Sequence, residues 1–238
     1  MINAKETDDT RRVRNIVLVH GAFADGSGWL GVYRILKDRG YNVIVVGHAN
    51  LGMEEDVAVT QRALNRIKGP VILVGHSYGG AIITQAGMSP NVAGLVYVSA
   101  FAPDKGETLG AIAAAAEPDP LAGFLPPEEG FIWYDKEKFQ CGFCADVPDD
   151  LAKFMADSQI PLAASAFGYV HSEPAWRYKP SWYCVATQDH SIQPDTERFF
   201  AQRMGAKVAE IDGSHVIYLS HPYIVADVID EAARNSLK

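Results

Sequence analysis

The stretch that decides the fold is VILVGHSYGG, residues 71–80, followed at once by the helix-compatible AIITQAG. An apolar run typical of a buried strand leads into Gly75-His-Ser77-Tyr-Gly79, the GxSxG pattern. A serine at a sharp strand-to-helix turn holds its hydroxyl above the sheet. The two glycines are needed because side chains there would collide with the neighbouring strand and helix. Between a strand and a helix this pattern indicates a nucleophilic serine; the alternative is a small-residue turn that only packs well.

Apolar runs and amphipathic stretches alternate on both sides of this motif. Continuous rather than alternating apolar runs are typical of strands covered on both faces, as in a parallel sheet. The sequence predicts strands at Asn15–Val19, Val43–Val46, Val71–Val74, Leu95–Ser99, Trp182–Ala186 and Lys207–Ile211. It predicts helices at roughly Trp29–Arg39, Val57–Ile67, Tyr78–Ala86, Asp195–Met204 and Pro222–Ala233. This order indicates an α/β fold with a doubly wound, mostly parallel sheet.

The alternation stops at Pro103 and resumes near Ser181. A structureless loop of that length is improbable inside a compact domain, and the interval is rich in proline and aromatic residues. We therefore expect residues 103–180 to form an inserted, mainly helical cap. We expect residues 15–102 and 181–238 to form the α/β core and residues 1–14 to form a flexible N-terminal segment.

A nucleophilic serine requires a base and a group that orients the base. Asp189 follows one predicted strand and His215 follows the last, in the chain order Ser…Asp…His. Both therefore lie at the carboxyl edge of the sheet, where open α/β sheets bind ligands. Asp104, which follows the strand at 95–99, is the main alternative to Asp189. An Asx-type turn before Pro194 is the structural alternative for Asp189 itself.

The other six histidines are weaker candidates for the base. We expect His20 and His76, which flank glycines in turns, to support loop geometry. His190 comes too early in the chain for the base. Surface or capping roles are expected for His48, His171 and His221, which lie in no motif.

An oxyanion intermediate needs backbone N–H donors aimed at it in advance. One should be the amide of Tyr78, directly after the serine. The other should come from the loop after the first strand, His20-Gly-Ala22-Phe23, where Gly21 permits close approach of the backbone. Ala22 is the expected second donor.

The chain resembles the α/β-hydrolase superfamily, and within it the small carboxylesterases grouped with plant methylesterases and hydroxynitrile lyases. The stretches that carry the resemblance span residues 15–225: IVLVHGAF, LVGHSYGG, LVYVSAFAPD, VATQDHSIQP and EIDGSHVIYLSHP. Hydroxynitrile lyases have a threonine where this chain has Gly21, and a lysine where it has Val216. Both departures favour hydrolysis. Haloalkane dehalogenases and epoxide hydrolases of this fold use an aspartate where this chain has Ser77.

These features predict a carboxylesterase-like enzyme that cleaves small carboxylic esters with water through a Ser77–His215–Asp189 triad and an acyl-enzyme. We expect no cofactor and no metal. Two alternatives stay open: the same triad acting on an amide, carbamate, lactone or C–C bond, or a non-catalytic receptor for a small ligand. Aromatic side chains of the cap and of the first loop line the substrate pocket or form the cap's own core. The candidates for the pocket are Phe23, Phe124, Trp133, Phe167 and Trp176.

Composition excludes several other classes. The 238 residues carry a net charge of −8 without a basic cluster, which argues against nucleic-acid binding. No apolar run is long enough to span a membrane, and the charged first residues do not look like a secretory signal. Three cysteines form no disulfide framework, so a cytoplasmic location is expected.

Two further features carry little weight. The CxxC of Cys141 and Cys144 lacks the context of a zinc or redox site. The GxGxxG at Gly26–Gly31 lacks the acidic residue of a nucleotide site. No feature indicates an oligomeric state.

Overall fold

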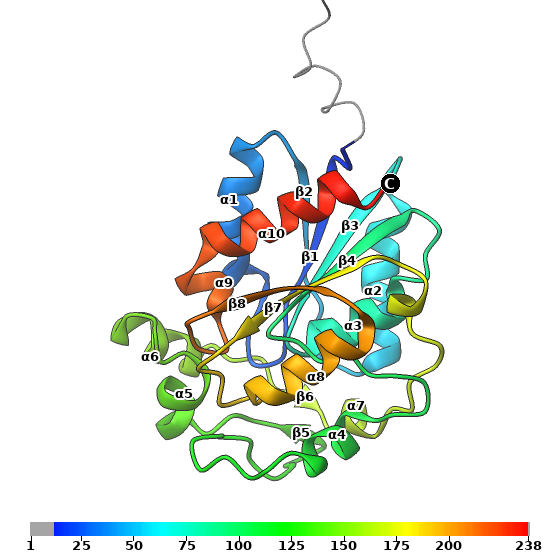
Figure 1. The fold of residues 1–238 in the computed structure, drawn as a ribbon. Helices are drawn as coiled ribbons and strands as arrows, with labels where there is room; N and C mark the ends of the chain where they lie inside the picture. The colour runs from blue at the N-terminus through cyan, green and yellow to red at the C-terminus, as the bar shows by residue number, and fades with distance from the viewer. Residues whose placement is uncertain (1–11, 238) are drawn as a thin grey trace, which may run out of the picture.

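A six-stranded parallel sheet forms the centre of the molecule. The computed structural model describes residues 12–237 (Figure 1). Its strands are β1 (Asn15–Val19), β2 (Asn42–Val46), β3 (Val71–His76), β4 (Val92–Val98), β7 (Ser181–Ala186) and β8 (Lys207–Ile211). They lie in the order β2-β1-β3-β4-β7-β8, and every neighbouring pair is parallel. Strands β3 and β7 are buried along their whole length, as continuous apolar runs require when both faces are covered.

Helices cover both faces of this sheet (Figure 1). Helix α1 (Leu30–Asp38), which follows the short 3-10 helix η2 (Gly26–Trp29), packs against α10 (Pro222–Asn235). Helices α2 (Met53–Asn65) and α3 (Tyr78–Ala86) pack against each other on the opposite face. Helix α8 (Pro194–Met204) packs on β7, and the short α9 (Ile217–Ser220) leads into α10. The predicted doubly wound α/β fold is confirmed.

The predicted elements differ from the observed ones mainly at their ends. Helix α2 begins at Met53, four residues before the predicted start at Val57. Its first turn holds three acidic residues, which favour a helix N-terminus although they interrupt the apolar pattern. Strand β4 begins at Val92 rather than Leu95, because Val92 pairs with Val71 across an irregularity in the register. The GxGxxG segment forms η2 and the start of α1.

The beginning of the chain is only partly described. Of the segment 1–14 that we expected to be flexible, residues 1–11 lie outside the described residues. Val13 is fully buried, and its N–H donates to the carbonyl of Ala233 at the end of α10 (2.8 Å). The packed chain therefore begins before β1.

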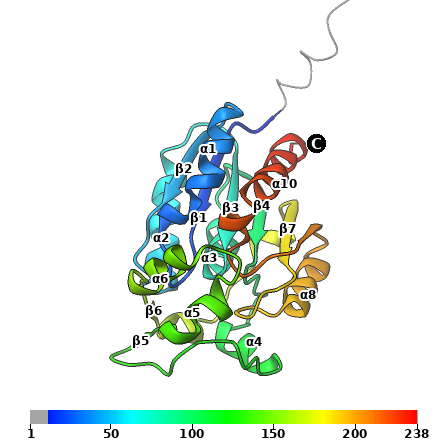
Figure 2. The same cartoon turned by 90° about the vertical axis from the view of Figure 1, so that its left-hand side faces the viewer.

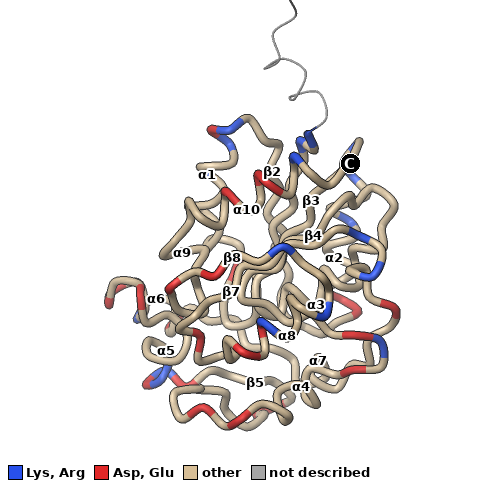
Figure 3. Tube along the Cα trace, viewed as in Figure 1, with Lys and Arg blue, Asp and Glu red and all other residues tan. Residues whose placement is uncertain are grey.

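Residues 103–180, the cap segment, connect β4 to β7. They contain α4 (Leu109–Ala115), β5 (Phe131–Ile132), α5 (Lys136–Phe143), α6 (Asp149–Asp157), β6 (Leu162–Ala163), α7 (Ser165–Gly168) and η3 (Ala175–Arg177). Strands β5 and β6 pair with each other and not with the central sheet. Figures 1 and 2 show α4, α5, α6, β5 and β6 beyond the carboxyl ends of the central strands, whereas η3 packs against α3. Acidic residues are frequent along this part of the chain (Figure 3).

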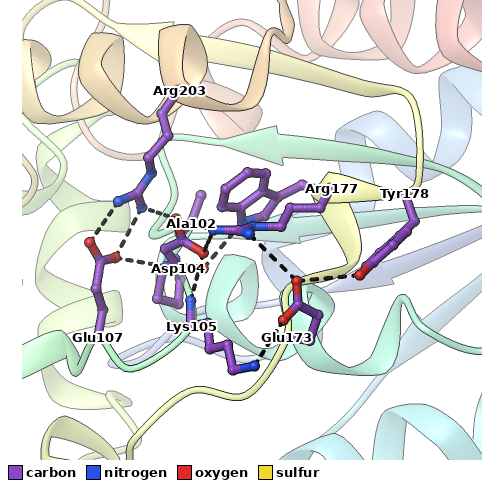
Figure 4. A network of polar contacts seen from close by, with 10 residues as sticks. Ala102, Asp104, Lys105, Glu107, Glu173, Arg177, Tyr178 and Arg203 are labelled. Atoms are coloured by element: carbon purple, nitrogen blue, oxygen red, sulfur yellow. Dashed lines mark hydrogen bonds and ion pairs between the residues drawn. The ribbon is translucent and has the colours of Figure 1, made fainter.

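A polar network ties both ends of the cap segment to the core (Figure 4). On α8, Arg203 donates to the Glu107 carboxylate (2.6 and 3.0 Å) and to the carbonyl of Ala102 (2.7 Å). Arg177, near the end of the segment, donates to both carboxylate oxygens of Asp104, near its start (2.7 and 2.8 Å). The two ends of the cap segment are therefore fixed side by side.

Candidate active site

Ser77 lies in the turn between β3 and α3. Its backbone has φ 53° and ψ −124°, a left-handed conformation that a non-glycine residue adopts only when its surroundings impose it. Its N–H donates to the carbonyl of Val98 (3.2 Å), and its carbonyl accepts from Gly80 and Phe101 (2.9 and 3.1 Å). These bonds hold the turn in the strained geometry expected of a nucleophile elbow.

The flanking glycines leave no room for a side chain. A Cβ atom on Gly75 would lie 2.4 Å from the carbonyl oxygen of Gly79. One on Gly79 would lie 2.5 Å from that of His20, in the loop after β1. Close packing of β3, α3 and the first loop therefore explains the spacing of the GxSxG pattern.

We expect Gly79→Ala to lower the free energy of unfolding by about 1–3 kcal/mol, because the added methyl group overlaps backbone atoms. Within a helix, Gly→Ala ordinarily raises the free energy of unfolding by about 1 kcal/mol. A decrease in Gly79→Ala would therefore indicate the steric overlap. Urea unfolding measures the difference. Gly168→Ala is the control, because a Cβ on Gly168 meets nothing within 4 Å. Equal losses in the two variants would contradict the packing argument.

His215 and Asp189 are in direct contact. His215 follows β8, Asp189 follows β7, and the His215 Nδ1 to Asp189 Oδ2 distance is 2.5 Å. Both side chains are buried, with relative exposures of 1% and 2%. The other Asp189 oxygen, Oδ1, accepts from the N–H groups of Ser191 (2.6 Å) and Ile192 (2.9 Å). Asp189 thus accepts three hydrogen bonds, and the one from His215 requires the tautomer with its proton on Nδ1.

His76 connects this pair to the elbow. Its Nε2 lies 2.9 Å from the carbonyl oxygen of His215, and the centres of the two rings lie 4.8 Å apart. Burial, and next the nearby His215, hold the pKa of His76 well below its ordinary value. The ring is therefore neutral, and its one N–H donates from Nε2. Because His76 directly precedes Ser77, this bond places His215 beside the elbow and confirms that His76 supports local geometry.

A residue of the cap segment also holds the histidine loop. Asp146, between α5 and α6, accepts from the N–H of Ser214 (3.0 Å) and from the Ser214 hydroxyl. A Cβ on Gly213 would lie 2.7 Å from Asp146 Oδ2 and 2.9 Å from Ile217 Cγ2, so a side chain at position 213 would have to displace one of these groups. His221 lies 3.9 Å from the same oxygen. Asp146 was absent from the candidates derived from the sequence, because no local motif marks a contact between segments 68 residues apart.

Asp104, the alternative orienting acid, is paired elsewhere. Its carboxylate binds Arg177 at the base of the cap segment (Figure 4). Of the two acids considered, Asp189 is the one that contacts His215.

The loop after β1 lies against Ser77. A Cβ on Gly21 would lie 2.6 Å from the Cβ of Ser77. Ala22 is buried, and the following residue, Phe23, has φ 61° and donates its N–H to the carbonyl of Ile160 in the cap segment (3.0 Å). Tyr78 is the first residue of α3, so its N–H has no acceptor within the helix. The backbone at Gly21, directly before Ala22, and the first turn of α3 at Tyr78 thus lie next to Ser77.

A buried polar network links these two elements. The rings of His20 and His48 stack with their centres 3.7 Å apart, and His48 Nε2 lies 3.0 Å from the carbonyl oxygen of His20. His48 Nδ1 lies 3.6 Å from Asp56, which accepts from the Tyr78 hydroxyl (3.0 Å). Burial, and next His48, lower the pKa of His20 to about 4. The expectation of a surface or capping role for His48 was wrong, because the ring is buried in this network, and Asp56 was missed because it lies in no motif.

His171 is also buried rather than at the surface, and neither of its ring nitrogens has a hydrogen-bond partner among the described residues. Burial, opposed by Glu107, lowers its pKa to about 4.

We therefore expect acid to destabilise the protein. Between pH 6.5 and about 4 the unfolded chain binds protons that neutral His20 and His171 in the native state do not. The free energy of unfolding must fall as the pH drops through this window, by up to about 3 kcal/mol per histidine. In His171→Phe, urea unfolding at pH 7 and pH 4.5 should give a smaller difference than in wild type. An unchanged difference would contradict the assignment.

A cavity of about 440 Å³ adjoins the site. Its wall includes Ser191 and Ile192, whose N–H groups bind Asp189, and Phe101, whose N–H binds the Ser77 carbonyl. Phe124 and Phe167, two of the predicted pocket residues, also line it.

The other predicted pocket residues lie elsewhere. Phe23 contacts Phe124 in an aromatic cluster that reaches His215 through Phe143, and it lines a separate cavity of about 320 Å³ between η2 and α6. Trp133 is 39% exposed and lines neither cavity. Trp176 is buried at the base of the cap segment, where its Nε1 donates to the carbonyl of Pro103 (3.1 Å). The pocket prediction was wrong for these two tryptophans, whose contacts depend on the path of the cap segment.

All three cysteines are free thiols, with Cys141 exposed and Cys144 and Cys184 buried. Among residues 12–237, no helix is long and apolar enough to cross a membrane.

Comparison with known proteins agrees with this fold. The sequence matches the Alpha/beta hydrolase family over residues 16–228. It is 31% identical over 160 residues to a carbendazim hydrolyzing esterase of Nocardioides sp. (strain SG-4G), a match that covers 61% of this chain and 64% of that protein. The chain thus spans slightly less than two thirds of that relative.

Two solved structures show similar folds. The crystal structure of a pyrethroid hydrolase from Sphingobium faniae JZ-2 superposes with a TM-score of 0.80 and 26% identity, covering 94% of this chain and 98% of that one. Polyneuridine aldehyde esterase superposes with a TM-score of 0.79 and 19% identity, covering 93% and 100% of the two chains.

The fold and the hydrolases among the similar proteins support an enzyme of the hydrolase class. The chain belongs to the Alpha/beta hydrolase family, and the predicted resemblance to its plant esterases is confirmed at the level of the fold.

Proposed function

We propose that the protein is a serine hydrolase that cleaves small carboxylic esters without a cofactor. The observation that carries the proposal is the His215–Asp189 hydrogen bond, held beside the strained Ser77 turn by the bond from His76. Relatives named for hydrolysing carbendazim and pyrethroids support ester-type hydrolysis.

In this mechanism Ser77 attacks the ester carbonyl while His215 accepts its proton. Asp189 holds the imidazole with Nδ1 protonated and stabilises the charged ring that forms. The amides of Ala22 and Tyr78 bind the oxyanion. His215 then gives the proton to the leaving alcohol, and a water molecule activated by the same ring releases the acid.

A panel of matched chromogenic substrates tests the bond that is cleaved. Short-chain nitrophenyl esters should be hydrolysed to acid and alcohol, and faster than the corresponding anilide, carbamate and lactone. Faster turnover of any of these would assign the site to that bond instead. Saturable binding of the esters without product would indicate a receptor and overturn the proposal.

The cavity beside the triad favours neutral substrates. Its apolar wall carries two carboxylates, those of Glu117 and Asp119, and the cap segment has 13 acidic against 6 basic residues, a net charge of 6 − 13 = −7. Asp119 lies 2.8 Å from His190, whereas Glu117 is exposed at the rim. A negative potential at the entrance lowers the local concentration of anions.

We therefore expect kcat/KM for a neutral ester to exceed that for a matched anionic ester by about tenfold at low ionic strength, with the ratio falling as salt is added. Glu117→Gln should lower the ratio of kcat/KM for the neutral ester to kcat/KM for the anionic ester. Equal kcat/KM values at low salt would show that the acidic rim does not influence selectivity.

A further inference from the structure

A second carboxyl group lies directly behind the proposed triad acid. Glu197, in the first turn of α8, is fully buried. Its Oε2 accepts from the N–H of Ala186 at the end of β7 (3.1 Å), and the carbonyl of that same residue accepts from the N–H of Asp189 (3.4 Å). The Glu197 carboxyl group lies within hydrogen-bonding reach of the Asp189 carboxyl group, and among the described residues Glu197 Oε1 has no other hydrogen-bond partner. Nothing in the mechanism above uses this buried group.

Two adjacent buried carboxyl groups cannot both carry a charge at neutral pH, and their surroundings decide which one is neutral. Asp189 accepts hydrogen bonds from His215, Ser191 and Ile192. Glu197 accepts one from a backbone amide, and the nearest cation, Arg198, extends outward to Asp195 and Glu210.

The remaining titratable neighbours of Glu197 supply no positive charge. Tyr183 and Cys184, on β7, are fully buried and stay neutral, because burial raises the pKa of both groups. Burial, and next the Asp189 charge, raise the pKa of Glu197 well above its ordinary value. The proton shared by the two carboxyl groups therefore belongs to Glu197.

We propose that Glu197 is a positioning residue that, as a neutral acid, donates a hydrogen bond from Oε1 to the Asp189 carboxylate while Oε2 accepts from Ala186. A protonated carboxyl can do both, since it has one O–H donor and a free acceptor oxygen. The bond fixes the Asp189 carboxylate toward His215 Nδ1 without adding a second negative charge. This inference rests on the proposed Ser77–His215–Asp189 mechanism.

Two substitutions test it. Glu197→Gln keeps the shape, with an amide N–H to donate to Asp189 and an oxygen to accept from Ala186. Glu197→Met fills similar volume and can do neither. We expect Glu197→Gln to keep kcat for a nitrophenyl ester within about threefold of wild type. Glu197→Met should lower kcat by about 10- to 100-fold with KM nearly unchanged. Thermal unfolding identifies any variant that fails to fold.

The pH dependence of kcat/KM separates a neutral Glu197 from a charged one. Replacing a neutral acid by an amide leaves the acid limb of the profile within about 0.3 pH units of wild type. If Glu197 were negatively charged, replacing it by glutamine would shift the acid limb to lower pH by about 0.5 pH units or more. The control is Glu210→Gln, the same substitution at an exposed carboxylate, which should leave the profile unchanged.

Two results would overturn the proposal: a shifted acid limb in Glu197→Gln, or equal losses of kcat in folded Glu197→Gln and Glu197→Met. If the Ser77→Ala variant still hydrolyses the ester at the wild-type rate, the mechanism on which the proposal rests is refuted instead.

Discussion

Replacing Ser77 by alanine should reduce kcat for ester hydrolysis by roughly 10⁴- to 10⁶-fold, because the proposed mechanism forms the acyl-enzyme on the Ser77 hydroxyl. The change removes one oxygen atom and leaves the turn intact, since the backbone bonds of residue 77 to Val98, Gly80 and Phe101 do not involve the hydroxyl. Initial rates with a nitrophenyl ester at enzyme concentrations up to micromolar measure a loss of this size.

The matched control is Ser181→Ala. Ser181 has the same 7% exposure as Ser77, but it lies at the start of β7, where its hydroxyl donates to the carbonyl of Lys179 (3.2 Å). Its kcat should stay within about threefold of wild type, because the substitution lies far from the carboxyl edge of the sheet. Comparable losses in the two variants would indicate a general effect on the fold rather than loss of a nucleophile.

Asp189→Asn should lower kcat by about 10⁴-fold with little change in KM. Asparagine fills the same space, but its amide can present an N–H to Nδ1 of His215 and so favour the tautomer that cannot accept the Ser77 proton on Nε2. The loss of kcat measures how much the 2.5 Å hydrogen bond between Asp189 and His215 contributes to catalysis.

Asp104→Asn is the control for this second prediction, because Asp104 follows the neighbouring strand β4 and binds Arg177 instead of His215. We expect its kcat to stay within about threefold of wild type, as partly exposed ion pairs contribute little. A large loss in Asp104→Asn together with an active Asp189→Asn would reverse the assignment of the orienting acid.

The parts of this site that could be predicted from the sequence are those encoded locally. The left-handed turn at Ser77 requires glycine at positions 75 and 79, so a few adjacent residues reveal it. Asp189 and His215 could be placed because the ends of parallel strands meet at one edge, and chain order alone then brings them together. The strands were located for a similar reason: both faces are covered, so their apolar runs are continuous.

What could not be predicted depends on contacts between distant segments. His48 and Asp56 lie in no motif, and only the packing of α2 against α3 brings Asp56 to the Tyr78 hydroxyl. The cap tryptophans Trp133 and Trp176 were assigned to the pocket from residue type. The path of the cap segment instead places Trp176 beside Pro103 at its base.

Glu197 illustrates the same limit more sharply. In the sequence it is one of two acidic residues in the first turn of a helix, a pattern usually explained by the helix dipole. Asp195, two residues earlier, fits that explanation and pairs with Arg198 in solvent. Only the structure shows that the Glu197 side chain points toward Ala186 and Asp189.

The most direct test of the central claim is covalent labelling of the wild-type protein with a fluorophosphonate, read by intact mass and peptide mapping. An activated serine reacts with this reagent, and an ordinary hydroxyl does not. We predict a single adduct, located on Ser77, and its absence in Ser77→Ala. An unlabelled wild-type protein, or an adduct on another residue, would contradict the account.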